Sequence, residues 1–235
     1  MKISKKILKL KIRKRNKMAH TNRQNIGKFW PIPRKGTKYL AVPSYDKNES
    51  IPLVVIVRDV LKIVRNKKEL QRLINEKRIK INHKEIRETN YPVCLFDVIN
   101  LIDIKKNYKA TFSENKKMIF EEISDKESET KIFKVINKKI LPGKKVQLNL
   151  MHGKNIISKE KVNTGDSLLL NLKDNKIIKI IKMEKGKNIF VIKGKHVGEN
   201  GKIDNIIERG GKTIAKIISD KGKVNVWIKN IIVIE

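Results

Sequence analysis

The first acidic residue of this chain is Asp46, and the segment before it carries many cations without a single carboxylate. Those cations are Lys2, Lys5, Lys6, Lys9, Lys11, Arg13, Lys14, Arg15, Lys17, Arg23, Lys28, Arg34, Lys35 and Lys38. Because like charges repel one another and little apolar surface is available for burial, such a block does not fold alone and is typical of an arm that binds nucleic acid. We therefore expect residues 1–27 to be an appendage that can be removed without loss of the fold.

The whole chain shares this bias, since 56 Lys and Arg residues against 24 Asp and Glu residues give a formal net charge of +32. A compact fold with this charge repels itself unless counterions or a polyanionic partner screen it. Nucleic acid and anionic membranes are both polyanionic. The longest unbroken apolar stretch, Leu53 to Val57, is far shorter than the about 20 residues that a membrane-spanning helix needs. We expect a nucleic-acid partner and no membrane.

The basic arm leaves one targeting alternative open, because transit peptides are also basic and poor in acids. A secretory signal is excluded, since no apolar core of about 7 to 15 residues follows the charges. The single cysteine, Cys94, excludes an intramolecular disulfide and any zinc site with several cysteines, which fits a cytoplasmic protein. The histidines His20, His83, His152 and His196 lie far apart without metal-ligand spacing, so we expect no metal and no cofactor.

After the arm, the stretch from Lys28 to Ser50 is rich in proline and predicts an extended, turn-rich segment. Helical spacing begins at Leu53, where Val57, Val60, Leu61 and Val64 would face the core and Arg58, Lys62 and Arg65 the opposite side. The pattern predicts one helix from Leu53 to Val64, with one apolar face and one cationic face.

A second helix is predicted from an N-cap at Asn66, with Glu69 three residues later, through Glu76. Its inward residues would be Leu70, Leu73 and Ile74. The two helices would form a short helical hairpin.

A β-hairpin is predicted next. Charged and apolar residues alternate from Arg78 to Ile81, Asn82 and His83 stand where a tight turn is needed, and Ile86 resumes the alternation. A strand from Asp97 to Ile104 would close a compact helix-hairpin-strand module with a basic outer face.

From Tyr108 onwards, short β-rich runs separated by turn residues suggest small β-barrels. The acid-rich stretch Glu121 to Glu129 interrupts this pattern and is expected to be a solvated loop near a domain boundary. Together, the patterns predict a mainly β chain with one α+β module.

Several sequence segments carry a resemblance to a known family. KFWPIPRKGTKYLAVPS, IPLVVIVRDVLKIV and INHKEIRETNYPVCLFDVI resemble the archaeal and eukaryotic small-subunit ribosomal protein S4e family, and TGDSLLLNL and KGKNIFVIKGKHVGENGKIDNI continue the likeness in the same order. The resemblance covers nearly the whole chain from Lys28 to Glu235. This chain departs from the family pattern at His83 and Cys94, where the family usually has glycine.

The resemblance implies four regions: a basic arm and extended segment at 1–50, an S4-like RNA-binding domain at 51–104, a central β domain at 105–182, and a KOW barrel of SH3-like form at 183–235. It also implies a structural constituent of the small ribosomal subunit that binds and stabilises small-subunit rRNA. Neighbouring ribosomal proteins would be further partners, and the location would be the cytoplasmic ribosome. No small-molecule substrate is implied.

RNA binding needs cations that reach phosphates and flat groups that stack on exposed bases. The candidate contacts lie in the arm, on the S4-like module and in the KOW-like loop. They are Lys5, Lys6, Lys9, Lys11, Arg13, Lys14, Arg15, Lys17, Arg23, Lys28, Trp30, Arg34, Lys35, Arg58, Lys62, Arg65, Lys68, Arg72, Arg78, Lys80, Lys193, Lys195 and His196. The alternative for the helical cations is a merely solvated surface.

The two tryptophans call for separate interpretations. Trp30 lies among basic residues and could stack on a base, although packing against the domain is the commoner role of such a residue. Trp227 lies in an alternating strand from Val224 to Ile228 and is expected in the core.

The sequence offers no enzyme motif. Gly210-Gly211-Lys212-Thr213 ends like a phosphate-binding loop, but Ile206 stands where the first glycine is required and no helix pattern follows. We expect no enzyme. Two alternatives remain: an RNA-modifying enzyme, since S4-type domains also occur on such enzymes, and a transcription-elongation factor, since KOW elements occur there too. The short strands after Ile104 argue against the first, and the S4-like half argues against the second.

Overall fold

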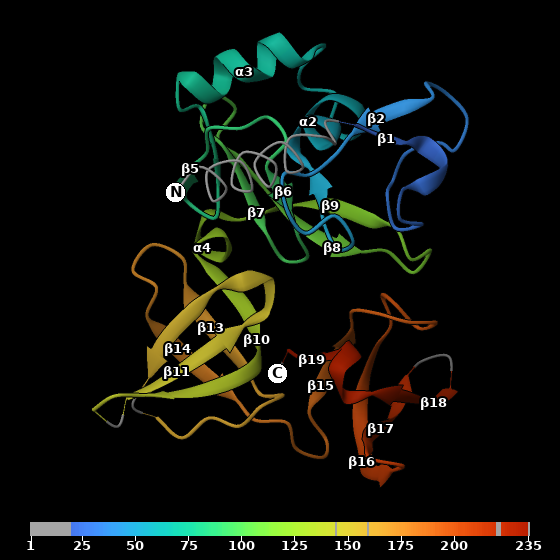
Figure 1. The fold of residues 1–235 in the computed structure, drawn as a ribbon, viewed down its shortest axis with the longest axis vertical. Coiled ribbons are helices and arrows are strands. Elements are labelled where there is room, and N and C mark those ends of the chain that lie inside the picture. Colours follow the sequence, from blue (N-terminus) through green and yellow to red (C-terminus); the bar gives the residue numbers. More distant parts are fainter. Residues whose placement is uncertain (1–19, 144, 159, 220–221, 235) are drawn as a thin grey trace, which may run out of the picture. The chain divides into compact units, whose positions relative to one another are not determined.

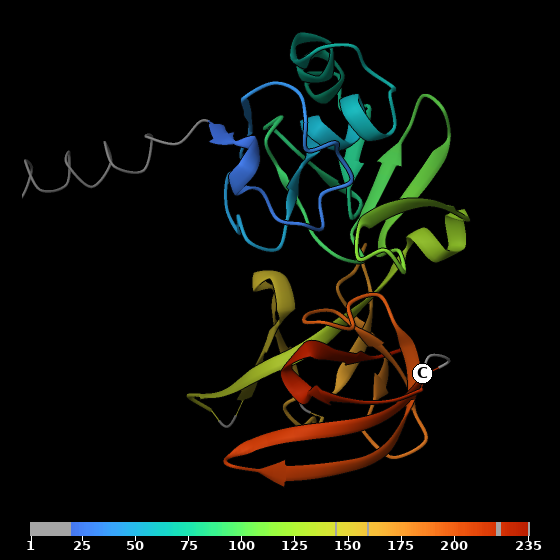
Figure 2. The ribbon, with the colours of Figure 1, turned by 90° about the vertical axis from the view of Figure 1, so that its right-hand side faces the viewer.

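The computed structural model describes residues 20–143, 145–158, 160–219 and 222–234 (Figure 1, Figure 2). The chain divides into two compact units. Unit 1 holds the described residues up to Lys77 together with Ile86–Cys94. Unit 2 holds Arg78–Glu85 and the chain from Leu95 onwards.

Unit 1 begins with strand β1 (His20–Asn22), which pairs antiparallel with β2 (Tyr39–Ala41). Arg23 follows β1 and holds the turn before β2: its Nε donates to the Thr37 carbonyl at 2.7 Å and its Nη1 to the Pro33 carbonyl at 2.6 Å. The expectation that all of residues 1–27 form a removable appendage is therefore wrong for β1 and Arg23, which are part of unit 1.

The predicted helix from Leu53 to Val64 is wrong in its length. After β3 (Ile51–Pro52), α2 covers only Leu53–Val55 and passes into a π-helical turn, Ile56–Val60. Lys62 then takes a φ of 54°, which ends the helical path. The physical reason is composition: a run of β-branched residues loses side-chain freedom in a helix, and every residue from Ile51 to Val57 is buried, on all sides of the turn.

The second helix, α3 (Lys67–Asn75), begins where the sequence predicts. The Asn66 side chain accepts a hydrogen bond from the Glu69 amide at 3.0 Å, and the Glu69 carboxylate accepts one from the Arg65 amide at 2.8 Å. Leu70 and Ile74 are buried, while Leu73 is half-buried. Strand β6 (Pro92–Val93) pairs with β3 and completes unit 1.

Unit 2 opens with a five-stranded antiparallel sheet in the order β5-β4-β7-β8-β9. Its strands are β4 (Ile79–Ile81), β5 (Lys84–Glu85), β7 (Val98–Leu101), β8 (Lys106–Phe112) and β9 (Met118–Ile123). The predicted β4–β5 hairpin is confirmed, with φ values of 51° at Asn82 and 60° at His83. The sheet runs on through β8 and β9, past Ile104.

The expected solvated loop from Glu121 to Glu129 is wrong. Glu121 and Glu122 lie in β9, and helix α4 (Asp125–Ser128) follows, with the Ser124 hydroxyl accepting from the Glu127 amide at 3.4 Å. The acids sit at exposed strand positions and in the first turn of a capped helix, where negative charge is stabilising.

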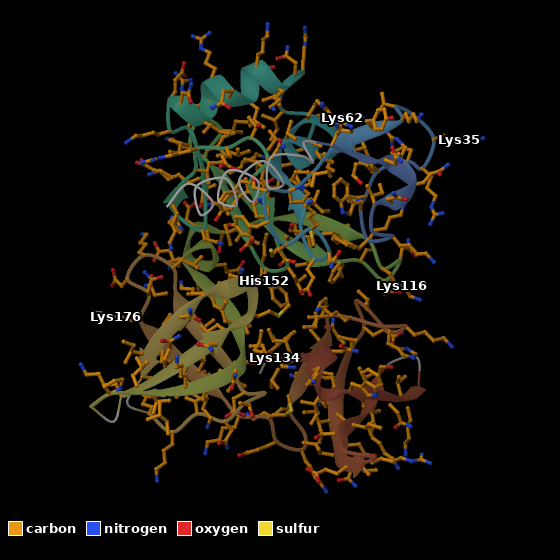
Figure 3. The ribbon with its side chains drawn as sticks, in the orientation of Figure 1. Lys35, Lys62, Lys116, Lys134, His152 and Lys176 are labelled. Atoms are coloured by element: carbon orange, nitrogen blue, oxygen red, sulfur yellow. The ribbon has the colours of Figure 1, made fainter. Side chains whose placement is uncertain are left out.

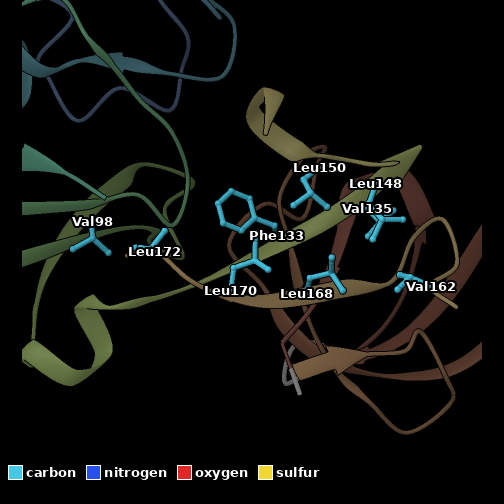
Figure 4. Close-up of a cluster of buried hydrophobic side chains, with 9 residues drawn as sticks. All are labelled: Val98, Phe133, Val135, Leu148, Leu150, Val162, Leu168, Leu170 and Leu172. Carbon is cyan, nitrogen blue, oxygen red and sulfur yellow. The ribbon is translucent and has the colours of Figure 1, made fainter. Parts of the chain in front are cut away.

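A second five-stranded sheet follows, in the order β12-β11-β10-β13-β14. Its strands are β10 (Thr130–Leu141), β11 (Lys145–Leu150), β12 (Asn155–Ser158), β13 (Ser167–Asn171) and β14 (Ile177–Ile181). Figure 4 shows its core, where Phe133 and Val135 of β10 meet leucines of β11 and β13.

The last sheet has the order β18-β17-β16-β15-β19. Its strands are β15 (Asn188–Val191), β16 (Asn200–Arg209), β17 (Lys212–Ser219), β18 (Gly222–Trp227) and β19 (Ile231–Val233). Strand β17 follows Gly210 and Gly211, so the phosphate-loop lookalike is a hairpin turn. The prediction of a mainly β chain is confirmed.

The expected burial of Trp227 is wrong, because 49% of its surface is exposed. Strand β18 alternates as predicted, but Val224 and Val226 form the inward set and Trp227 falls on the outer face. Among the described helices, none combines the length and apolarity needed to cross a membrane.

Candidate nucleic-acid interface

Unit 1 contains a groove of about 1010 Å³ between the β1–β2 segment and the helical turns that lead into α3. We call it the basic groove. Its cations are Arg23, Lys35, Arg58, Lys62, Arg65 and Lys67. Within the described lining, Asp59 is the one carboxylate. The groove therefore concentrates positive charge from two segments that are distant in the sequence.

The groove cations differ in how strongly they are engaged. Arg58 makes a two-bond pair with Asp59, with Nε–Oδ1 and Nη2–Oδ2 distances of 2.8 Å each. This hydrogen bonding raises the pKa of Arg58 above its ordinary value, although partial burial acts in the opposite direction. The Arg23 guanidinium group donates hydrogen bonds to the Thr37 and Pro33 carbonyls in the turn before β2.

The side chains of Lys35, Lys62 and Arg65 are exposed and form no ion pair within the described part of the chain; Figure 3 labels Lys35 and Lys62. Lys62 has a left-handed backbone conformation, which ends the helical turn at this residue. Its side chain lines the groove. Their hydrogen-bond donors can therefore bind an anionic ligand such as a phosphate group.

Tyr39 gives the groove an aromatic surface that the sequence reasoning missed. It lines the groove, is 51% exposed, and meets the His20 ring edge-on with 4.7 Å between centroids. The Lys38 ammonium lies 5.4 Å from the centre of the Tyr39 ring. The signal was the alternation in β2, where buried Leu40 leaves Tyr39 on the outer face.

Trp30, the aromatic that the sequence singled out, is only 4% exposed. Its packing role is thus the one that the structure supports. A base can stack only on a ring with an open face.

The remaining candidates lie outside the groove. In unit 1, Lys68 and Arg72 are exposed on α3, with Arg72 paired to Glu76 at 2.8 Å, and Lys28 and Arg34 are exposed elsewhere. The arm candidates fall outside the described residues; they are Lys5, Lys6, Lys9, Lys11, Arg13, Lys14, Arg15 and Lys17.

Five candidates belong to unit 2. Arg78 pairs with Asp103 at 3.1 Å, and Lys80 lines a smaller pocket beside His83. In the loop before β16, Lys193 and Lys195 are exposed, while His196 Nδ1 lies 3.1 Å from a carboxylate oxygen of Glu199. The structure thus gathers only part of the predicted set into one surface.

Comparison with known proteins agrees with this architecture. A model of the S4 domain matches residues 51–99, and a model described as ribosomal family S4e matches residues 104–177. The first match spans α2, α3, the β4–β5 hairpin and the start of β7, and the second spans β8 to β13 and the first residue of β14.

The chain is 34% identical to the small ribosomal subunit protein eS4 of Archaeoglobus fulgidus over 78% of each chain. It is 36% identical to the eS4 protein of Methanosphaera stadtmanae over 80% of this chain and 79% of that one. The crystal structure of the 30S ribosomal protein S4e from Thermoplasma acidophilum superposes with a TM-score of 0.69 at 27% identity, covering 80% of this chain and 96% of that one.

Proposed function

The chain belongs to the ribosomal S4e family, a family of structural proteins and not of enzymes, and from this premise we propose that it binds small-subunit rRNA directly through its basic groove. The observation that carries the proposal is the joint presence of Lys35, Lys62 and Arg65 as exposed cations around one groove. Phosphate contacts of this kind position a protein on RNA without reading its sequence.

Tyr39 adds a second element to the proposal. An exposed ring at the edge of a cationic groove can stack on an unpaired base whose phosphates lie in the groove, a geometry that selects single-stranded or bulged RNA over a regular duplex. The groove would then recognise the shape of a loop or bulge.

The proposed setting is the small subunit in cytoplasmic ribosomes, with rRNA and neighbouring ribosomal proteins as partners. The family supports this setting. From the sequence resemblance we also propose an S4-like RNA-binding domain at 51–104, a central β domain at 105–182 and a KOW barrel at 183–235; the match of the S4 domain model to residues 51–99 supports the first of them.

Sedimentation of a native lysate through a gradient at moderate and at high salt tests the ribosomal role. We expect one copy per small subunit at moderate salt. A protein that sediments alone, or with RNA polymerase, would contradict the proposal.

The groove itself is tested with the double variant Lys62→Gln with Arg65→Gln. Its affinity for small-subunit rRNA should fall, and the slope of log affinity against log salt should become shallower by about 0.7–0.9 for each lost contact. Lys176→Gln with Lys185→Gln is the matched control, since it also removes two positive charges and both lysines are exposed on unit 2 outside the candidate set (Lys176 is labelled in Figure 3). Equal losses in both variants would show that only net charge matters.

A further inference from the structure

Strands β16, β17 and β18 carry apolar and basic side chains on the face that points away from the core of their sheet. These residues do not belong to the basic groove. Strand register places Trp227 opposite Ile214, and Ile214 opposite Ile207. These residues form one apolar row across three strands.

Two further rows lie beside it. Lys216 is flanked by Asn205 and Asn225, and the next row holds Ile218 flanked by Lys202 and Lys223. We call these nine positions the Trp227 face. They contain three lysines and no carboxylate.

The Trp227 face is open in unit 2. Trp227 is 49% and Ile218 47% exposed, and all three of its lysines are exposed. The core of this sheet lies on the other side, where Ala215, Ile217 and Val226 are buried. An exposed apolar surface framed by polar groups is typical of a binding site.

The chemistry of the face points to one class of ligand. A tryptophan ring stacks on any nucleotide base, because every base offers a flat π surface. Lys216 is the diagonal neighbour of Trp227 on the adjacent strand, a spacing of about 7–8 Å in antiparallel sheets, so its long side chain can reach a phosphate next to a stacked base. The absence of carboxylates among the nine positions favours a polyanion over a typical protein surface.

We propose that the Trp227 face is a second RNA-binding site, which takes a single-stranded segment with one base stacked on Trp227 and phosphates on Lys216, Lys223 and Lys202. It lies on unit 2 and shares no residue with the basic groove. It shares only the ligand class with the proposed function, so either site can fail without the other.

The test uses the full chain with both tryptophans replaced by fluorotryptophan, whose two fluorine NMR resonances are assigned with a Trp227→Phe variant. A short oligouridylate is added, and separately a duplex RNA of equal length. We expect the Trp227 resonance to shift with the single strand and not with the duplex, because paired bases leave no face for stacking. The resonance of buried Trp30 should stay in place.

The lysines are tested in the same experiment. Lys216→Gln with Lys223→Gln should raise the RNA concentration at half-maximal shift by about two- to fivefold for each lysine. Lys62→Gln with Arg65→Gln should lower total RNA affinity and leave the Trp227 shift intact, which separates this site from the groove.

Three results would overturn the proposal. One is an equal shift with single-stranded and duplex RNA, which would indicate attraction by charge alone. Another is a Trp227 resonance that stays in place while the RNA still binds elsewhere. The third is a shift produced by RNA-free small-subunit proteins and not by RNA, which would make the face a protein-docking surface.

Discussion

Lys131 and Asp97 form an ion pair inside unit 2: Nζ lies 2.5 Å from Oδ1, and the two side chains are 1% and 8% exposed. Asn82, in the β4–β5 turn, donates to the same oxygen at 2.6 Å. Lys131 lies on β10, so the pair joins the hairpin of the S4-like module to the first strand of the next sheet. Burial by itself raises the pKa of Asp97, but the charge of Lys131 and these hydrogen bonds outweigh it and lower the pKa below its ordinary value.

Replacing Lys131 with methionine should destabilise the protein by about 3–5 kcal/mol, because Asp97 would stay buried without its counter-charge. Urea unfolding of the wild type and of Lys131→Met measures the loss. The double variant Lys131→Met with Asp97→Asn should recover part of it, since no charge is then buried. A single variant within about 1 kcal/mol of the wild type would show that the pair is not a major source of stability.

The lowered pKa of Asp97 predicts a loss of stability in acid. In the unfolded chain this carboxyl titrates near 3.8, and its folded pKa is lower, so its contribution is complete above that value and disappears as the pH falls below it. The difference in unfolding free energy between the wild type and Asp97→Asn, measured from pH 6 downwards, should therefore shrink as the pH falls below 3.8. A constant difference between the two proteins over this range would contradict the assignment.

Lys134 should show a pH dependence of the same sign, but in the alkaline range. Burial, and to a lesser degree the charge of Lys193, lowers its pKa from 10.5 to about 8. Between these values the unfolded chain binds a proton that the folded chain has lost, so this group adds stability as the pH rises.

From pH 8 to pH 10, the free energy of unfolding of the wild type should rise relative to Lys134→Met by about 2 kcal/mol. Lys176→Met controls for the change in net charge (Figure 3). Parallel pH profiles for the wild type and Lys134→Met would show that Lys134 titrates normally.

Two truncations separate the arm from unit 1. Removal of residues 1–19 should leave the free energy of unfolding nearly unchanged and weaken RNA binding, because eight candidate cations are lost while β1 and Arg23 stay. Removal of residues 1–27 should cost a further about 1–3 kcal/mol, since the hydrogen bonds of Arg23 and the β1–β2 pairing go with it. Equal stability of the two truncated proteins would show that β1 contributes nothing.

Local sequence signals predicted local structure well. The Asn66 cap, the turn at Asn82 and His83, and the strand alternation around Leu40 each involve residues close together in the chain, where spacing alone carries the information. The helix from Leu53 failed because its apolar residues are buried on every side, so a helical period could not mark one face.

The basic groove could be predicted only in part. Helical spacing singled out Lys62 and Arg65, but Lys35 joins them from a segment more than twenty residues earlier, which no local pattern reveals. The basic residues around Trp30 suggested that its ring could stack on a base. In the structure Trp30 is buried, and Tyr39 and Trp227 are exposed rings that could do so. Which of several aromatic rings stays open depends on packing between distant segments, and this must be seen in the structure.

The hydrogen bonds of Lys134 also bear on the order of events during synthesis. This buried ammonium donates to the Ile228 and Ile231 carbonyls, which lie 94 and 97 residues further along the chain. In the same sheet, β19 (Ile231–Val233) pairs with the earlier strand β15 (Asn188–Val191). During translation, Lys134 leaves the ribosome well before the two carbonyls that accept its hydrogen bonds. The edge of β15 that pairs with β19 stays unpaired until β19 has also emerged. The last sheet can therefore close only after Val233 has left the exit tunnel.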